Sequence, residues 1–316
     1  MALELLSSRA IIGSYYAKLD INSGMGWING ITNLFQSDQD SETYVWLGMS
    51  PQLREWVGGR QAKGFNENKL TIKNKHFEGT LEFLKKDLRR DKTGQVMVRV
   101  HDLADRTSSH WASLASSLIL NGASTTCYDG QYYFSTTHQE GVSPTQSNKL
   151  AVTLSTLPCQ VHGVAAAPSV EEMQQCILKA VAQIISFVDD QGEPMNENAS
   201  EFLIMVPTSL YLAAEAATKN AVLTSNAVNL LPNLEGMKFG VAMNARLNSW
   251  PSTFCVFRTD ASVKPIIRQE EAPVQMKAKA EGSEFEFDND AWQFGVDTWR
   301  NVGYGYWQQS CQVVMS

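Results

Sequence analysis

Residues 51–99 most strongly constrain how this 316-residue chain can fold, because they form a long charged stretch with few apolar side chains. The stretch is typical of an extended hairpin: LREWVGGRQAK leads to a polar tip at residues 64–69, and LTIKNKHFEGTLEFL returns. Apolar residues fall at even positions up to Ile72 and at odd positions from Phe77, which indicates a bulge or a change of the covered face. An isolated two-stranded ribbon is only marginally stable in water. We therefore expect this ribbon to lie against another surface.

Charge is distributed unevenly along the chain. Residues 51–99 hold 12 lysines and arginines against six acids, whereas the whole chain holds 26 against 33 and has a formal net charge of −7. The segment therefore carries +6 and the remainder −13. A basic segment on an acidic body can bind other copies of the same chain. The overall acidity argues against a dedicated nucleic-acid-binding protein, which needs a clustered cationic surface.

Composition predicts a globular chain. Hydrophobic residues make up 43% of it, and no stretch approaches the roughly 18 apolar residues of a membrane span. The first 20 residues show no basic leader before an apolar run, so we expect synthesis in the cytoplasm. The five cysteines include no CxxC pair, a pattern that favours buried thiols over a disulfide framework or a structural zinc site.

After the charged turn KKDLRRDKTG, the run QVMVRV predicts a half-buried strand, because Val96, Val98 and Val100 alternate with other residues. A helix of about 20 residues is expected at 102–121, with acids in its first turn and a glycine after its end. Such a helix would be about 30 Å long. It could serve as a spine for this part of the chain.

A second helix is predicted from Ser169, since Glu172 three residues later completes a capping box. The following FLIMV strand, the helix after Pro207, and the strand candidates MKFGVAMN and TFCVFRTD indicate an α/β module of about 100 residues. The tail returns to strand character in EFEF, WQFGVDTW and YGYWQQ. These last strands are expected to close onto the part of the chain that contains the spine helix.

Cys127 with Asp129 and His138 is the nearest candidate for catalysis, because it combines a nucleophile, an orienting group and a base. The neighbouring sequence matches no nucleophile elbow or cysteine-protease signature. A buried thiol and a hydrogen-bonded histidine are the favoured interpretation. No GxxxxGK[ST] phosphate loop occurs either.

Two groups could be imagined as metal ligands: Cys159 with His162, and His101 with Asp102 and Asp105. Each group lacks two further ligands at plausible spacing. The second is better explained as the start of a helix, where carboxylates complement the helix dipole. No metal and no cofactor are therefore expected.

Eight tryptophans are numerous for this length, and most of them are expected in the core. Trp27, Trp46 and Trp56 lie in segments that have no obvious core within the chain. We expect these three residues to contact other subunits.

Several runs of sequence resemble one family, the major head subunit of Mu-like tailed phages. They are SDQDSETYVWLGMSPQLREWVGGRQAKG, KNKHFEGTLEFLKKDLRRDKTGQ, LADRTSSHWASL, NGASTTCYDGQYYFSTTH, QSN, KPIIRQEE and GVDTWRNVGYGYWQ. Together they spread from about residue 9 to residue 310 and cover nearly the whole chain.

The resemblance implies an α+β chain with the HK97-like (Hong Kong 97-type) major capsid protein fold. In that fold an arm leads into an extended hairpin called the E-loop, a peripheral domain carries the spine helix, and an axial α/β domain is inserted. The corresponding segments are an N-terminal arm at 1–45, the E-loop hairpin at 46–92, the peripheral domain at 93–165, the axial domain at 166–262 and peripheral return strands at 263–316.

The resemblance also implies the function of a structural protein rather than an enzyme: pentamers and hexamers close into the icosahedral shell around a phage's double-stranded DNA genome. Scaffold, portal and decoration proteins are possible partners, the packaged DNA is expected to be contacted weakly and non-specifically, and no membrane is involved. The expected location is the virion, after assembly in the host cytoplasm.

The arm and the E-loop would lie across neighbouring subunits and find there the apolar cover that they lack within the chain. The predicted interface residues are Trp27, Trp46, Arg54, Trp56, Arg60, Lys63, Phe65, Lys69, Arg89 and Arg90. As a hypothesis, acidic patches of adjacent copies, such as Glu270, Glu271, Glu281, Glu284 or Glu286, face five of these cations: Arg54, Arg60, Lys63, Arg89 and Arg90. Two alternatives stay open: a nanocompartment shell of the same fold that packages proteins, and a hydrolase that uses Cys127 and His138.

Overall fold

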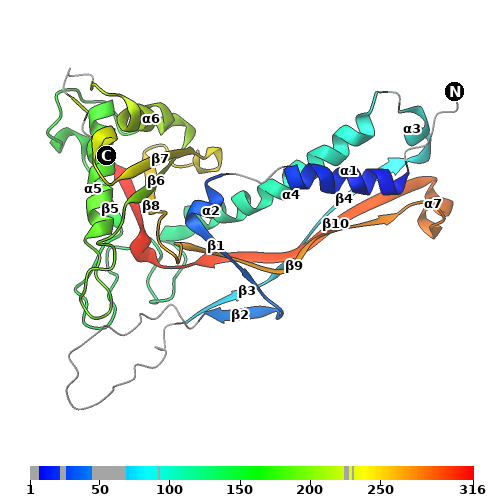
Figure 1. Cartoon of the computed structure of the whole chain (residues 1–316), viewed down its shortest axis with the longest axis horizontal. Helices are drawn as coiled ribbons and strands as arrows, with labels where there is room; N and C mark the ends of the chain where they lie inside the picture. The colour runs from blue at the N-terminus through cyan, green and yellow to red at the C-terminus, as the bar shows by residue number, and fades with distance from the viewer. Residues whose placement is uncertain (1–6, 22–25, 45–68, 92, 224–227, 230) are drawn as a thin grey trace, which may run out of the picture.

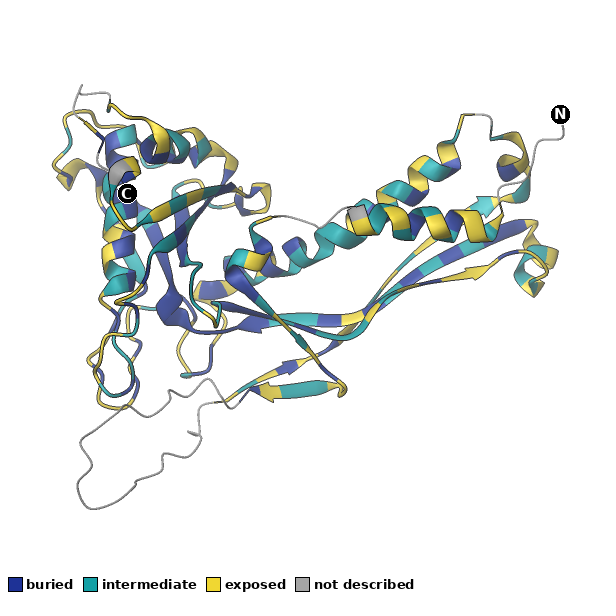
Figure 2. Cartoon of the chain, viewed as in Figure 1, coloured by how far each residue is buried: buried dark blue, intermediate teal, exposed yellow. Residues whose placement is uncertain are grey.

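A computed structural model describes residues 7–21, 26–44, 69–91, 93–223, 228–229 and 231–316. The chain forms an elongated part, built on a long twisted sheet with two helices along it, and a compact part that is joined to one end of it (Figure 1). Buried residues gather between the helices and the sheet in each part, while the outer sides of the two long helices are exposed (Figure 2).

The elongated part contains a four-stranded sheet whose central strands β9 and β10 form a long antiparallel hairpin. Strand β1 pairs in parallel with β9. Strand β4 pairs antiparallel with β10 along the whole length of β4. In order across the sheet the strands are β1 (Thr32–Gln36), β9 (Ile266–Lys279), β10 (Ala291–Tyr304) and β4 (Lys75–Leu84).

The spine helix α4 is longer than predicted and extends over Gln95–Leu120, 26 residues, or about 39 Å. The predicted strand at its start was wrong. Val96 and Val100 are buried whereas Val98 is 66% exposed, because positions four apart share one face of a helix and the position between them points away. The Asp91 carboxylate accepts the backbone N–H groups of Gln95 and Val96 at 3.0 and 2.9 Å, which satisfies the start of the helix.

Helix α1 (Ser8–Ile21) packs along α4 within the same chain. Ile11 and Tyr15 are fully buried in a core that also contains Val100 of α4, and the Tyr15 hydroxyl donates to Thr107 Oγ1 at 3.1 Å. The apolar side chains of this part of the predicted arm are therefore buried within the same chain. Two short helices accompany it, α2 (Ile28–Ile31) and α3 (Lys85–Arg90), and α3 replaces the predicted charged turn.

The returning half of the predicted ribbon is divided at Asn74. Strand β3 (Leu70–Lys73) pairs with β2 (Ser41–Tyr44), and the chain then continues as β4 in the long sheet. Ile72 is buried at an even position, while odd positions of β4 such as Phe77 and Phe83 are half-buried. The predicted switch of the covered face is confirmed, and β4 pairs with β10 and packs against α4 of the same chain.

The compact part is built on a five-stranded sheet. Helix α5 begins with the predicted capping box, in which Ser169 and Glu172 each accept the other's backbone N–H. The strands in order are β5 (Lys149–Val152), β11 (Ser310–Met315), β8 (Thr253–Arg258), β6 (Glu201–Val206) and β7 (Lys238–Met243), and the helices are α5 (Val170–Ile185) and α6 (Tyr211–Lys219). The 3₁₀ turns are η2 (Asn121–Ala123), η3 (Leu154–Thr156), η4 (Thr208–Leu210), η5 (Leu231–Asn233), η6 (Ala245–Leu247) and η7 (Trp307–Gln309).

Two expectations for residues 263–316 need correction. The final strand β11 pairs with β5 and β8 in the compact part, so the chain does not end beside the spine helix. The EFEF run forms the short helix α7 (Glu284–Asn289) between β9 and β10, because Ser283 accepts the backbone N–H of Glu286 at its start. The proposed domain boundaries otherwise stay a prediction.

Candidate interaction surfaces and buried side-chain clusters

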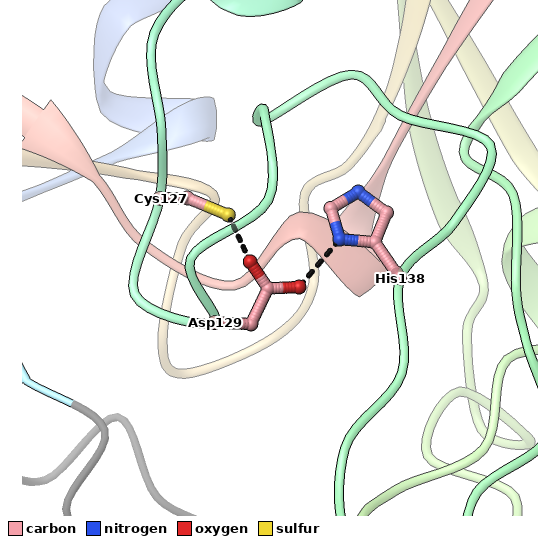
Figure 3. Close-up of side chains that lie close together, drawn as sticks. All are labelled: Cys127, Asp129 and His138. Carbon is pink, nitrogen blue, oxygen red and sulfur yellow. Dashed lines mark hydrogen bonds and ion pairs between the residues drawn. The ribbon is translucent and has the colours of Figure 1, made fainter.

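Cys127, Asp129 and His138 do lie together, in the loop region between η2 and β5, but in an order unsuited to catalysis. The Asp129 carboxylate lies between the other two side chains (Figure 3). It accepts a hydrogen bond from the Cys127 thiol at 2.9 Å and contacts His138 Nδ1 at 2.6 Å. A catalytic histidine must contact the nucleophile itself. Burial raises the pKa of the Cys127 thiol, and the Asp129 carboxylate raises it further. A raised pKa favours the protonated thiol, so the order of the side chains and the pKa both count against the hydrolase alternative.

The same three side chains form a satisfied hydrogen-bond network. The side-chain oxygen of Asn148 lies 3.2 Å from His138 Nε2, and the Asn148 amide nitrogen donates to the carbonyl of Tyr133 at 2.7 Å. Both ring nitrogens of His138 therefore lie within hydrogen-bond distance of an oxygen atom. Although burial acts to raise it, the hydrogen bonds from His138 and Cys127 hold the pKa of Asp129 below its usual value. The Asp129 carboxylate and the His138 ring form a buried hydrogen-bonded pair.

A metal ion would have to displace these hydrogen bonds. The three ligand atoms lie within 4.8 Å of one another, and no other group of three or more such residues occurs in the described part of the chain. A closed zinc site needs four ligands, whereas here each donor hydrogen already has an acceptor. The arrangement is explained by hydrogen bonding alone.

A second buried carboxylate adjoins this cluster. Glu140 Oε1 accepts hydrogen bonds from Tyr128 Oη at 2.6 Å, Trp307 Nε1 at 3.1 Å and Gln308 Nε2 at 3.2 Å. Burial nevertheless raises the pKa of Glu140. The loop that carries Glu140 and His138 is thereby fixed to η7. Sequence reasoning missed Glu140 and Trp307, because their partners lie far away along the chain.

The other imagined ligands have ordinary structural partners. His162 Nδ1 lies 2.9 Å from the Glu172 carboxylate, at the capping box of α5. His101 contacts Ser14 of α1 at 2.8 Å, and Asp102 forms an ion pair with Arg106, one helical turn later. These groups stabilise helix ends and helix contacts.

Six of the predicted interface residues lie outside the described residues: Trp46, Arg54, Trp56, Arg60, Lys63 and Phe65. Of the others, Trp27 is half-buried and packs against the main core in a pocket that Phe202 and Phe239 also line. The expectation that Trp27 has no core within its own chain was therefore wrong. Lys69 is exposed. The interface roles of all ten residues stay predictions.

Arg89 and Arg90 lie exposed on α3. No ion pair of either residue occurs within the described ranges. Their neighbour Lys85 pairs with Glu286 of α7 at 2.5 Å. The hydrogen bond from Lys85, supported by those from Trp292 and the backbone of Gly282, lowers the pKa of Glu286 to about 2. Glu286 is therefore engaged within the chain.

Among the residues that the structure describes, no helix is both long enough and apolar enough to cross a membrane.

The sequence matches the profile of one family, described as Mu-like prophage major head subunit gpT, over residues 20–156 and 234–314. A curated relative, the Mu-like prophage FluMu major head subunit of Haemophilus influenzae, is 24% identical over 281 residues, which are 89% of this chain and 63% of that protein. The major capsid protein of Escherichia phage Mu is 33% identical over 110 residues, 35% of this chain and 36% of that protein. The chain thus spans less than two thirds of the length of the curated relatives it matches.

Solved structures share the fold. A chain of the bacteriophage JBD30 procapsid superposes with a TM-score of 0.56 and 19% identity, covering 98% of this chain and 75% of that one. A chain of the virus-like particle from Pyrococcus furiosus gives 0.53 and 9% identity, covering 96% and 98%. A chain of the bacteriophage PhiM1 mature capsid gives 0.52 and 10%, covering 92% and 86%. The fold is the HK97-like fold of phage capsid proteins, with both helices and sheets.

Proposed function

The chain belongs to the Mu-like prophage major head subunit gpT family, and we propose that it assembles with copies of itself into the protein shell of a phage head. The observation that carries the proposal is the match to subunits of shells along the whole molecule, 98% of it in the JBD30 procapsid. The family match covers segments on both sides of residues 157–233, so both the elongated and the compact part belong to it.

The shape of the molecule supports this function physically. An elongated subunit with a compact head offers many separate surfaces for head-to-tail contacts, and heterologous contacts of this kind generate closed rings. Each contact can be weak, because a shell joins every subunit to several others and the contacts act together. Pentamers and hexamers that close into an icosahedral shell are the arrangement we propose.

The contents and the partners of the shell belong to the same proposal. The shell encloses double-stranded DNA, which contacts the protein weakly, since the chain outside residues 51–99 carries −13. Scaffold, portal and decoration proteins would complete the particle, assembly would take place in the host cytoplasm, and the protein would reside in the virion. The proposed role requires no reaction.

Electron microscopy of the purified full chain tests the proposal. The chain is expressed alone and together with the other head proteins of its virus, and closed shells of uniform size are expected. Chain that remains monomeric in both preparations, at millimolar subunit concentration, would contradict the proposal. The nature of the contents separates a head from a nanocompartment: DNA supports the former, whereas a packaged enzyme without nucleic acid supports the latter.

A further inference from the structure

Helix α7 presents an aromatic side chain to solvent at the far end of the elongated part. Phe287 is 90% exposed, the highest value for any large apolar residue in the described part of the chain. It is surrounded by negative charge, because residues 281–290 contain five acids and no base. A soluble subunit gains nothing from an isolated, fully exposed phenyl ring, whereas an interface uses such a ring as an anchor.

The short helix that carries Phe287 is held firmly. Glu286 accepts hydrogen bonds from Trp292 Nε1 at 3.0 Å and from the backbone of Gly282 at 2.7 Å, in addition to its ion pair with Lys85. The backbone of Lys85 also donates to the carbonyl of Asp290 at 2.8 Å. Phe287 is thus displayed on a rigid base and would lose little conformational freedom on docking.

An unfilled groove of about 420 Å³ lies at the same end of the molecule, between β4, α3 and the start of α4. Leu81, Phe83 and Val96 supply its apolar lining. A volume of this size accommodates a ring together with part of a helix. Phe287 of the same chain does not fill it, because that ring is exposed.

The surroundings of the groove are cationic. Helix α3 carries four bases and one acid, and Arg90 and Arg99 line the groove. Neither arginine has an ion pair within the described residues. Three acids also line the groove: Asp91, which binds the first N–H groups of α4, Glu82, which accepts from Gln293 at 2.9 Å, and Asp87, which is exposed on α3. The excess of positive charge therefore lies on α3 at the edge of the groove, and it is opposite in sign to the charge around Phe287.

We propose that Phe287 of one copy of this chain docks into the groove between β4, α3 and α4 of a second copy, with its flanking acids facing Arg90 and Arg99. The proposal rests on the proposed function and deepens it by naming two surfaces that join subunits. Phe287 and the groove are different surfaces at one end of the molecule. Each subunit therefore inserts its Phe287 into one neighbour and receives the Phe287 of another. Contacts of this heterologous kind close into a ring around the point where these ends meet.

Single substitutions of the full chain test the contact. Phe287→Ser is expected to lower the yield of particles at least tenfold and to leave the circular dichroism spectrum of the monomer unchanged, because the ring contacts little of its own chain. Val142→Ser is the matched control, since Val142 is 78% exposed in the loop region between η2 and β5, away from α7. Equal particle yields for Phe287→Ser and the wild type would overturn the proposal.

Charge reversal tests the electrostatic half of the contact. Arg90→Glu and Asp288→Arg should each reduce the yield of particles, and the double variant should recover most of it. A double variant that is as defective as the worse single variant would count against the pairing. Asp288 is exposed, so neither single change is expected to unfold the chain.

Cross-linking distinguishes failure of this contact from failure of the proposed function. Particles that carry Phe287→Cys and Glu82→Cys should give a ladder of covalent multimers on non-reducing gels after mild oxidation, whereas Val142→Cys with Glu82→Cys should give none. If the wild type forms particles but the double-cysteine chain gives no ladder, the contact is overturned and the shell function stands. The same holds if another head protein is found in the groove. A wild-type chain that forms no particles at all would overturn both.

Discussion

The imidazole of His138 stacks on the indole of Trp307, with ring centroids 4.0 Å apart and planes 7° apart. Trp307 is fully buried in η7, where the chain passes from β10 of the elongated part to β11 of the compact part. His138 is fixed in turn by Asp129 and Asn148. The stack therefore ties the loop region between η2 and β5 to the crossing between the two sheets.

Removal of the Asp129 carboxylate beside this stack should destabilise the protein. Asp129→Asn removes the carboxylate that hydrogen-bonds both His138 and Cys127, and the loss of a buried hydrogen bond to a charged group typically costs about 1.5–3 kcal/mol. We expect a loss of this size in the free energy of unfolding, measured by urea denaturation of the unassembled chain.

Cys127→Ser provides the matched control. The serine hydroxyl still donates to Asp129, so the expected loss is about 1 kcal/mol or less. A similar stability for Asp129→Asn and Cys127→Ser would contradict the central role of the Asp129 carboxylate in the cluster.

The environment of His110 makes stability depend on pH. Burial, together with the nearby charges of Arg300 and Arg246, lowers the pKa of His110 to about 4 from its ordinary 6.5. The neutral ring accepts from Arg300 Nε at 3.0 Å. Between pH 6.5 and 4 the unfolded chain binds a proton at this residue and the folded chain does not, so the free energy of unfolding falls as the pH is lowered.

His110→Gln tests this dependence, because the amide oxygen can accept from Arg300 without titrating. We expect the free energy of unfolding of the wild type to fall more steeply than that of the variant between pH 6.5 and 4, and the two curves to run parallel above pH 7.5. Parallel curves through the whole range would show that His110 is not held neutral by the fold.

Local signals in the sequence predicted the helix caps and the strand break, because those features depend on neighbouring residues. Ser169 with Glu172 marked the start of α5, and the change of parity after Ile72 marked the break between β3 and β4. These predictions are confirmed since a cap or a parity switch has the same physical cause in any surroundings.

Ambiguous periodicity explains the errors. Val96 and Val100 fit a strand with period two as well as a helix with spacing four, and only the packing of α1 against that face decides for the helix. The alternating EFEF run is a helix because Ser283 caps it. The stack of His138 on Trp307 could not be predicted, since it depends on a contact across 169 positions that no local pattern records.

The ion pair between α3 and α7 should appear as a stabilisation that acid removes. The pKa of Glu286 is lowered to about 2 from its ordinary 4.5, so the stabilisation is complete above pH 4.5 and is lost as the pH falls towards 2. Lys85→Met removes the partner and should bring the pKa of Glu286 back towards its usual range. The melting temperature of the variant should then depend less on pH between 4.5 and 2.5 than that of the wild type. An identical dependence would contradict the assigned role of Lys85.

Gly305 follows β10 at a place where the backbone approaches itself too closely for any side chain. A Cβ atom there would lie 2.4 Å from the carbonyl oxygen of Lys264, a backbone atom that cannot move aside alone. Gly305→Ala should therefore lower the free energy of unfolding by about 1–3 kcal/mol. Gly295→Ala in β10 is the control, because its nearest contact would be an ordinary 3.5 Å to Thr80 Oγ1. Alanine costs less conformational entropy than glycine in a strand, so this control should be neutral or stabilising by up to about 1 kcal/mol. Equal losses for both variants in urea denaturation would show that the close approach at Gly305 does not constrain the crossing between the sheets.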